Sequence, residues 1–321
     1  MPDAKPAFPP GLGVAIVVVS VSFAAPLFRL TDAPPVTASF WRLAFAVLLL
    51  LPFSFGALQA WRAYRAPEWR ITTAAGLALA AHFALWVTSL FMTSVAAATC
   101  LVTLQCVFVA LGGHFLLGDR LGRMGWTGVA AASLGGIVIA LGDGALAPDS
   151  ATAIWGDVLA TVAGLGSAAY MLIGRRLRRD RGLVEYVLPV YAIAAVGLAV
   201  AALVLRQPLL SFTQSTSPAN GAAAWLATHF GAWAPFVVFV LLAAVPMLGG
   251  HTVSNWVLKH LPAHTVATWI LLEPVGAALL AWPVLGEVPL ATTWMGGALV
   301  LLGAFLTIPR RGATAATEPA G

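Results

Sequence analysis

The clearest shortage in this sequence is charge. Only 9% of its 321 residues are Asp, Glu, Lys or Arg, whereas a soluble domain carries about 25%. Apolar residues make up 60% of the chain, and its mean hydropathy is +0.91. A water-soluble fold is therefore excluded, and the length has to be divided into membrane spans rather than soluble domains.

Cysteine and catalytic motifs are also scarce. The two cysteines, Cys100 and Cys106, would lie on different faces of one helix, so they indicate neither a disulfide framework nor a metal site. The sequence contains no HExxH, GxSxG or P-loop motif. We therefore expect no enzyme activity, no cofactor and no metal. Without a nucleotide-binding segment, this chain alone is not an ATP-driven pump.

What the chain has instead is long apolar runs. A span needs about 20 mostly apolar residues, and continuous runs of that length predict helices rather than barrel strands. We predict an all-α integral membrane protein with ten transmembrane helices over residues 11–30, 36–57, 71–91, 94–117, 122–141, 153–174, 184–205, 234–258, 263–286 and 290–309. The first is longer than a typical signal-peptide core, and Pro26 is poorly placed for cleavage, so we expect it to be retained.

The basic residues predict the orientation of these helices. With a cytoplasmic N-terminus, ten spans place fourteen of the 17 Lys and Arg residues on the inner side, which is the positive-inside bias. We therefore expect a multi-pass protein of the bacterial inner membrane with both termini cytoplasmic, including a tail over 310–321. The run "GRRLRRDRG" (174–182) is expected to be a cytoplasmic anchor. This distribution explains the net charge of +5, so no nucleic-acid partner is predicted.

The chain contains an internal repeat. Shifted by 168 positions, residues 101–141 face residues 269–309 with eleven identities in forty-one pairs, including Trp126 with Trp294. The chain therefore divides into two five-helix repeats, 11–142 and 153–309. Because five is odd, the repeats cross the membrane in opposite senses, and inverted repeats of this kind are typical of secondary transporters.

Several segments carry a resemblance to a known family: "GD" at 118–119 and "GE" at 286–287, the glycine-rich windows five and ten, and the stretches 80–102 and 245–263. They resemble EamA-type members of the drug/metabolite transporter superfamily, over residues 12–141 and 153–309. The resemblance implies ten helices, alternating access, and a site lined by helices 1, 3, 4, 6, 8 and 9. It implies no single substrate, since the family carries amino acids, purines, amphipathic drugs and nucleotide sugars.

One position departs from the family pattern. Cys106 stands where the family often has proline, whereas Pro274 is present at the matching place in the second repeat. A helix kink is therefore expected in the second repeat and is left open in the first.

Glu273 is an acid that the apolar pattern does not explain. It lies about ten residues into its window, or about 15 Å by helix rise, near the middle of the membrane. Charge there costs at least about 2.5–3.5 kcal/mol. Pro274 behind it kinks the helix and frees a backbone acceptor. We expect Glu273 to face a cavity and bind a cationic group or carry a proton; the alternative is a protonated acid bonded to a neighbouring helix.

Two histidines fall at corresponding places in the repeats if one residue of slippage is allowed. His82 and His251 each have a companion four residues on, Trp86 and Asn255, on the same helical face. Histidine can relay protons near neutral pH, but a histidine bonded to a backbone carbonyl only joins two helices. Trp86 is suited either to stack on a heteroaromatic solute or to pack in the core.

Three further polar residues lie within the predicted helices. Gln105 matches Glu273 in the repeat and extends its polar layer, and Tyr170 either lines the pathway or joins two helices. Arg42 is expected to snorkel outward or pair with a carboxylate, with a positioning role. The substrate-binding candidates are therefore Glu273, His82, Trp86, Gln105, Tyr170, His251 and Asn255.

Taken together, these features predict a secondary transporter embedded in the lipid bilayer. Its solute is expected to be a small metabolite, amino acid-like or heteroaromatic, or an amphipathic drug, moved in the direction of efflux. Proton coupling is left open. Glycine-rich windows five and ten allow close helix approach, either to each other or across a homodimer contact. An integral-membrane enzyme and a passive channel are the alternative functions.

Overall fold

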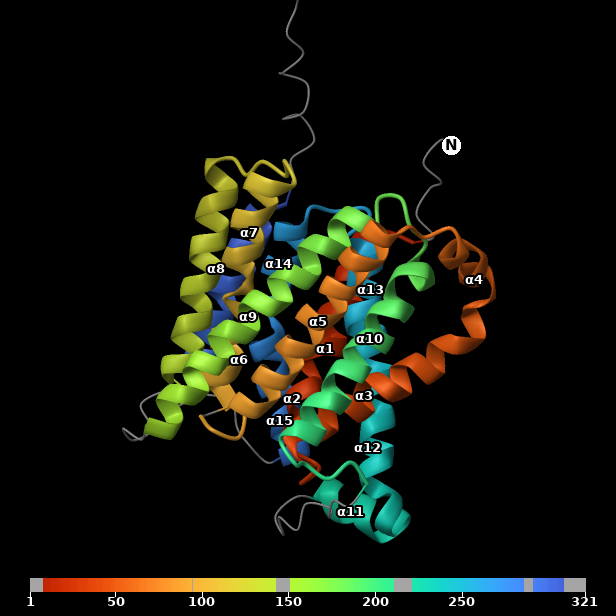
Figure 1. Cartoon of the computed structure of the whole chain (residues 1–321). Coiled ribbons are helices and arrows are strands. Elements are labelled where there is room, and N and C mark those ends of the chain that lie inside the picture. The colour runs from red at the N-terminus through yellow and green to blue at the C-terminus, as the bar shows by residue number, and fades with distance from the viewer. Residues whose placement is uncertain (1–7, 94, 143–150, 211–220, 286–290, 309–321) are drawn as a thin grey trace, which may run out of the picture.

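The computed structural model describes residues 8–93, 95–142, 151–210, 221–285 and 291–308, and every regular element within them is a helix. The long helices run side by side as one bundle (Figure 1). They are α1 (Pro10–Ser22), α2 (Ala24–Phe28), α3 (Pro35–Leu50), α4 (Phe55–Arg62), α5 (Ala66–Ser89), α6 (Val95–Thr103), α7 (Gln105–Leu116), α8 (Arg123–Gly142), α9 (Ala151–Leu177), α10 (Leu183–Val204), α11 (Gly221–Phe230), α12 (Ala234–Leu242), α13 (Val253–Val257), α14 (Ala263–Ile270), α15 (Glu273–Leu285) and α16 (Ala291–Leu306). A π-helical stretch, Ala243–Thr252, joins α12 to α13.

Length and composition mark several of these helices as candidate membrane spans. Seven qualify in the described part of the chain: Pro10–Phe28, Pro35–Phe53, Ala66–Ser89, Ile154–Leu177, Leu183–Val204, Gly221–Val257 and Ala263–Val284. Leu101–Leu116 and Trp294–Leu306 are apolar but shorter. The all-helical membrane fold is confirmed, whereas the count of ten stays a prediction. Glu287 and the expected tail 310–321 lie outside the described residues.

Both ends of the described chain lie at the same end of the bundle. Phe8 stacks on Trp256 with ring centroids 4.0 Å apart, and the Thr265 hydroxyl donates to the Thr307 carbonyl at 3.1 Å. Trp256 and Thr265 flank a single connection, between α13 and α14, so the start of α1 and the end of α16 meet there. An even number of crossings requires this arrangement.

Helices α8 and α16 pack closely at one edge of the bundle, where α8 is seen in Figure 1. A Cβ added at Gly135 would lie 2.5 Å from the Gly296 carbonyl, and one at Gly303 would lie 2.5 Å from the Gly128 carbonyl. Only glycine permits this backbone approach. Of the two contacts that the sequence allowed, these glycines make the one within the chain.

Helix interruptions cluster where the bundle surrounds its centre. The α6–α7 helix is interrupted at Leu104, and the α14–α15 helix at Leu271 and Leu272. Gln105 and Glu273 are therefore each the first residue of a helix, at positions that the repeat pairs. The kink left open in the first half is present without a proline. Gly164 of α9 explains how: a Cβ there would lie 2.9 Å from the Val102 carbonyl, so α9 packs directly onto the interrupted backbone.

Candidate functional site

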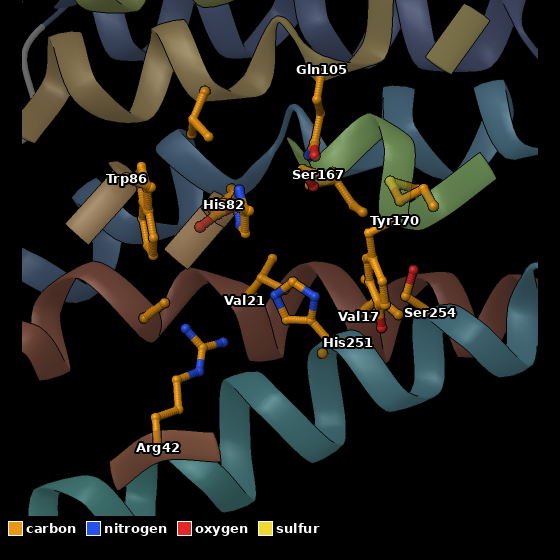
Figure 2. Close-up of a pocket in the computed structure, with 16 residues that line it drawn as sticks. Val17, Val21, Arg42, His82, Trp86, Gln105, Ser167, Tyr170, His251 and Ser254 are labelled. Atoms are coloured by element: carbon orange, nitrogen blue, oxygen red, sulfur yellow. The ribbon is translucent and has the colours of Figure 1, made fainter. Parts of the chain in front are cut away.

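A small cavity lies at the centre of the bundle, within reach of both interruptions. Its volume is about 40 Å³, and a single water needs about 10–15 Å³. Figure 2 shows Arg42 and Gln105 entering it from opposite sides, with His82 and His251 between them. It is lined by Val17, Val21, Ala24, Arg42, His82, Trp86, Val102, Gln105, Ser167, Tyr170, Met171, Gly250, His251, Ser254, Ile270 and Glu273.

Six of the seven residues singled out in the sequence lie on this lining, namely Glu273, His82, Trp86, Gln105, Tyr170 and His251. They come from five separate helical segments that are far apart in the chain. Glu273 is 9% exposed and lies in the same wall as Ile270. The helix interruptions explain the positions of Gln105 and Glu273, because a side chain at the first turn of a half-helix projects toward the gap.

The two histidines are neighbours in the cavity lining, with their rings tilted relative to each other. His82 and His251 have ring centroids 6.2 Å apart, and Phe83 lies 5.2 Å from the His251 ring. The Nδ1 atom of His82 lies 3.0 Å from the Ala163 carbonyl, so His82 also joins α5 to α9. A carbonyl accepts only, which makes Nδ1 the donor and leaves Nε2 as an acceptor when the ring is neutral. His251 lies near the end of the π-helical stretch.

Trp86 extends the aromatic wall of the cavity. Its ring is nearly parallel to that of His82, at 6.1 Å and 2°, and meets Phe28 edge-on at 6.0 Å. The indole Nε1 is buried and has no hydrogen-bond partner among the described residues, and the same holds for Oε1 of Gln105. A buried donor or acceptor without a partner is uncommon in a folded protein, so these atoms are suited to meet a bound solute.

Asn255 lies behind the lining rather than on it. Its side-chain amide donates to the Tyr170 hydroxyl and, at 2.7 Å, to the His251 carbonyl one turn earlier. Asn255 is fully buried, and a Cβ at Gly174 would lie 2.8 Å from its Oδ1. The structure thus places this residue where it orients Tyr170, because the Asn255 amide holds the hydroxyl from the side away from the cavity.

Arg42 is the lining residue whose position the sequence did not reveal. The expectation that it snorkels outward is wrong: it is 1% exposed, and its guanidinium lies 4.3 Å from the centre of the Phe83 ring. Its place early in an apolar helix suggested an interfacial residue, but α3 is surrounded by other helices at that depth. Ser167 and Ser254 also line the cavity, and serine in an apolar run carries too weak a signal to be selected.

A network of charged side chains closes the bundle between the cavity and the arginine-rich connection 174–182. Asp119 pairs with Arg175 at 3.2 Å and with Arg179 at 3.7 Å, and Arg175 also donates to the Leu258 carbonyl at 2.7 Å. Gly118 adopts a φ of +69°, which glycine tolerates and which turns the chain so that Asp119 reaches these arginines. The network ties α9 to α13 and to the α7–α8 connection.

Arg178 continues this closure. Its Nε donates to the Asn255 carbonyl at 3.1 Å, directly beneath the Tyr170 contact. Burial lowers the pKa of Arg178 to about 10, so the side chain remains cationic at neutral pH. The hydrogen bond of Arg178 thus links the arginine-rich connection to the residue that contacts Tyr170.

A second group of charges lies at the same end. Arg181 pairs with Glu68 and, at 3.1 Å, with Glu185, and the Tyr64 hydroxyl donates to Glu185 at 3.0 Å. Burial, followed by the charge of Glu185, raises the pKa of Tyr64 to about 12. Glu68 and Glu185 also accept from the backbone at the starts of α5 and α10, which stabilises both helix ends.

Among the described residues, no cluster of three or more His, Cys, Asp or Glu side chains is arranged to hold a metal ion. Cys106 is a buried free thiol, 3.5 Å from the Ser133 hydroxyl.

Comparison with known proteins places this geometry in context. Residues 11–141, and again residues 154–308, match the EamA-like transporter family. A riboflavin transporter of Rhizobium johnstonii is 33% identical over 130 residues, which span 38% of this chain and 42% of that protein. A solved crystal structure, 18% identical, is similar with a TM-score of 0.68 over 92% of this chain and 95% of its own. At that identity the likeness shows the fold alone.

Proposed function

Because this chain belongs to the EamA-like transporter family, we propose that it is a secondary transporter that exports a small heteroaromatic solute across the bacterial inner membrane. Membrane transport follows from the family, and the solute, direction and mechanism are the proposal. The mechanism is alternating access by rocking of two inverted five-helix halves, 11–142 and 153–309, with both termini cytoplasmic.

One observation carries the proposal. A mid-bundle cavity gathers polar side chains from both halves, and some of their hydrogen-bonding atoms have no partner in the described structure: Nε1 of Trp86, Oε1 of Gln105, and Nε and Nη1 of Arg42. Inverted-repeat transporters hold substrate near the midplane, beside interrupted helices. A structural core would instead satisfy or exclude such groups.

The aromatic wall supports a heteroaromatic solute in particular. The parallel rings of Trp86 and His82 provide a flat surface beside hydrogen-bonding groups, which suits a planar ring with polar edges. The partly matching relative is named for riboflavin, whose ring system has this character. An amino acid-like solute with an aromatic side chain fits the same features, and an amphipathic drug uses the rings but not the polar atoms.

The small size of the cavity supports a site that opens and closes as the helices around it move. About 40 Å³ holds a few waters and no heteroaromatic ring. Binding a solute therefore requires the walls of the cavity to separate. Helices α9 and α13 would move apart to open the cavity at the arginine-rich end, or the helices at the opposite end would move apart to open it there. A closed centre is the conformation that alternating access passes through between its two open states.

The test is flux through purified protein in liposomes, with riboflavin and L-tryptophan as probes and protein-free liposomes as the blank. Saturable flux that one unlabelled probe inhibits supports a carrier, and Trp86→Ala should reduce it several-fold while Trp225→Ala, on the exposed face of α11, leaves it unchanged. Flux that rises linearly with concentration indicates a channel. Conversion of the probe to a product indicates an enzyme, and no flux of either probe refutes a heteroaromatic solute.

A further inference from the structure

Arg42 is buried in the cavity wall in a manner unlike the other arginines of the described chain. It extends from α3 to a place between two aromatic rings, 4.3 Å from the Phe83 centroid and 5.9 Å from the Phe28 centroid. Figure 2 shows its guanidinium pointing toward the cavity. At 1% exposure the group has given up nearly all contact with water.

The hydrogen bonds that should replace this water are incomplete. Neither Nε nor Nη1 of Arg42 has a partner among the described residues. By contrast, the buried Arg178 donates from Nε to a backbone carbonyl, and Arg175 uses three nitrogens on Asp119 and Leu258. A buried cation without partners is costly, and cation–π contact recovers only part of that cost.

Within the described residues, no ion pair supplies the missing partner of Arg42. The four ion pairs found in the described residues involve Arg175, Arg179 and Arg181, and none involves Arg42. Glu273 lines the same cavity, and its charge and that of Arg42 influence each other. The other titratable groups on the lining are His82, His251 and Tyr170, and none of them carries a negative charge at neutral pH.

We propose that Arg42 binds an anionic group of the transported solute, a carboxylate or a phosphate, while the aromatic wall takes its ring. This proposal rests on the proposed function and narrows it to heteroaromatic anions and zwitterions. Arginine is suited to the role because its planar group donates to two oxygens of such an anion at once and is weakly hydrated. The guanidinium also lies near the Phe83 and Phe28 rings, and its unpartnered Nε and Nη1 are the atoms available to the solute.

Glu273 gives the site a second charged group, of opposite sign to Arg42. A zwitterion, such as an aromatic amino acid, would meet Arg42 with its carboxylate and Glu273 with its ammonium group. A simple anion would meet Arg42 alone, with Glu273 protonated. The site thus selects against a heteroaromatic cation that lacks an acidic group, because such a solute leaves Arg42 unpaired.

The experiment compares matched probes that differ only in the anionic group. These are indole-3-propionate against indole-3-propionamide, and riboflavin 5′-phosphate against riboflavin, measured by binding to the purified full-length protein and by flux in liposomes. The wild-type protein should bind each anion about tenfold or more tightly than its neutral partner, as expected for a charged hydrogen bond that a neutral amide or hydroxyl cannot replace. Arg42→Gln should remove this preference, so that each anion and its neutral partner bind with similar affinity.

Two variants keep the result clear. Arg42→Lys retains the charge without the fork and should retain part of the preference, which also guards against misfolding of the glutamine variant. Arg29→Gln removes an exposed arginine and should retain the full preference for the anionic probes. The proposal is overturned if the wild-type protein binds both members of each pair equally, or if the preference for the anion survives Arg42→Gln. In either case, saturable flux of the neutral probes would still support the proposed transporter function. If no probe is bound or moved, the heteroaromatic function fails first and this inference fails with it.

Discussion

Charged side chains collect in two regions of this molecule, and they are paired in one region and unpaired in the other. At the arginine-rich end, Asp119, Glu68 and Glu185 are each bonded to at least one arginine, and the surplus donors reach backbone carbonyls. In the central cavity, Arg42 and Glu273 share a wall without an ion pair, beside the unpartnered atoms of Trp86 and Gln105.

This difference indicates a structural role for the paired charges and a binding role for the unpaired groups. Paired charges hold helices in one arrangement, and removing one partner leaves the other costly. Unpaired groups around a space are costly until something fills it, so they persist where a ligand supplies the missing bonds. We therefore expect changes in the cavity to alter what is transported and how it is driven, and changes at the charged end to alter which conformation is populated.

The largest effect is expected for Glu273→Gln. If Glu273 carries the coupling proton, the amide cannot, so flux driven by a pH gradient should fall to the level seen without a gradient. Exchange of labelled for unlabelled solute should continue, because it needs no net proton movement. The measurement is flux in liposomes with and without an imposed gradient.

His251→Gln is the matched comparison for that experiment. If this variant loses the gradient response and Glu273→Gln retains it, the proton is carried by the histidine pair and not by the carboxylate. If both variants respond to the gradient as the wild type does, neither residue couples transport to protons.

A smaller effect is expected when the charged end is weakened. Asp119→Asn removes the shared acceptor of Arg175 and Arg179, so the end of the bundle that they close should open more often. With Cys100 and Cys106 replaced, a cysteine at position 254 in the cavity should react several-fold faster with an impermeant maleimide applied from that end.

Asp180→Asn serves as the control for this change. It makes the same alteration of charge at an exposed position of the same end and should leave the labelling rate unchanged. Equal acceleration by both variants would mean that net charge, and not the bonded network, governs access.

The smallest effect is expected for Tyr64→Phe, at the half-buried rim of the charged end. Losing the bond to Glu185 should cost a few tenths to about 1 kcal/mol of folding free energy. The folded-state pKa is raised from 10.0 to about 12, so the neutral hydroxyl is the stabilising form. The advantage of the wild type should therefore be complete below pH 10 and disappear as the pH rises toward 12. Thermal unfolding of both proteins across that range checks this, and an advantage that grows with pH would contradict it.

Much of the fold could be predicted because the signals were local or periodic. Apolar run length predicted the helices. The repeat paired Gln105 with Glu273, and the structure gives both the same place at the start of a helix. The cavity residues were found because a polar side chain inside an apolar helix requires an explanation.

The errors and omissions arose where the outcome depended on packing between helices. Arg42 was expected either to snorkel outward or to pair with a carboxylate, because its depth was judged from its own helix, whereas it is buried beside Phe83 and Phe28. Asn255 was grouped with the binding residues by its spacing from His251, and that role stays a prediction, because its amide bonds to Tyr170 and it is not among the residues that line the cavity. The interruption at Leu104 has no neighbouring proline that could have predicted it, and it lies where Gly164 of α9 closely approaches the chain.

The sequence by itself determined that this chain is a helical membrane protein of two related halves with polar residues at matching depths. These properties follow from composition, run length and self-similarity, which each segment carries alone. Only the tertiary structure decided which of those residues share one cavity, which charges are paired and which are left open. Pairing depends on distances between side chains that are far apart in the chain, and those distances are set by how whole helices pack.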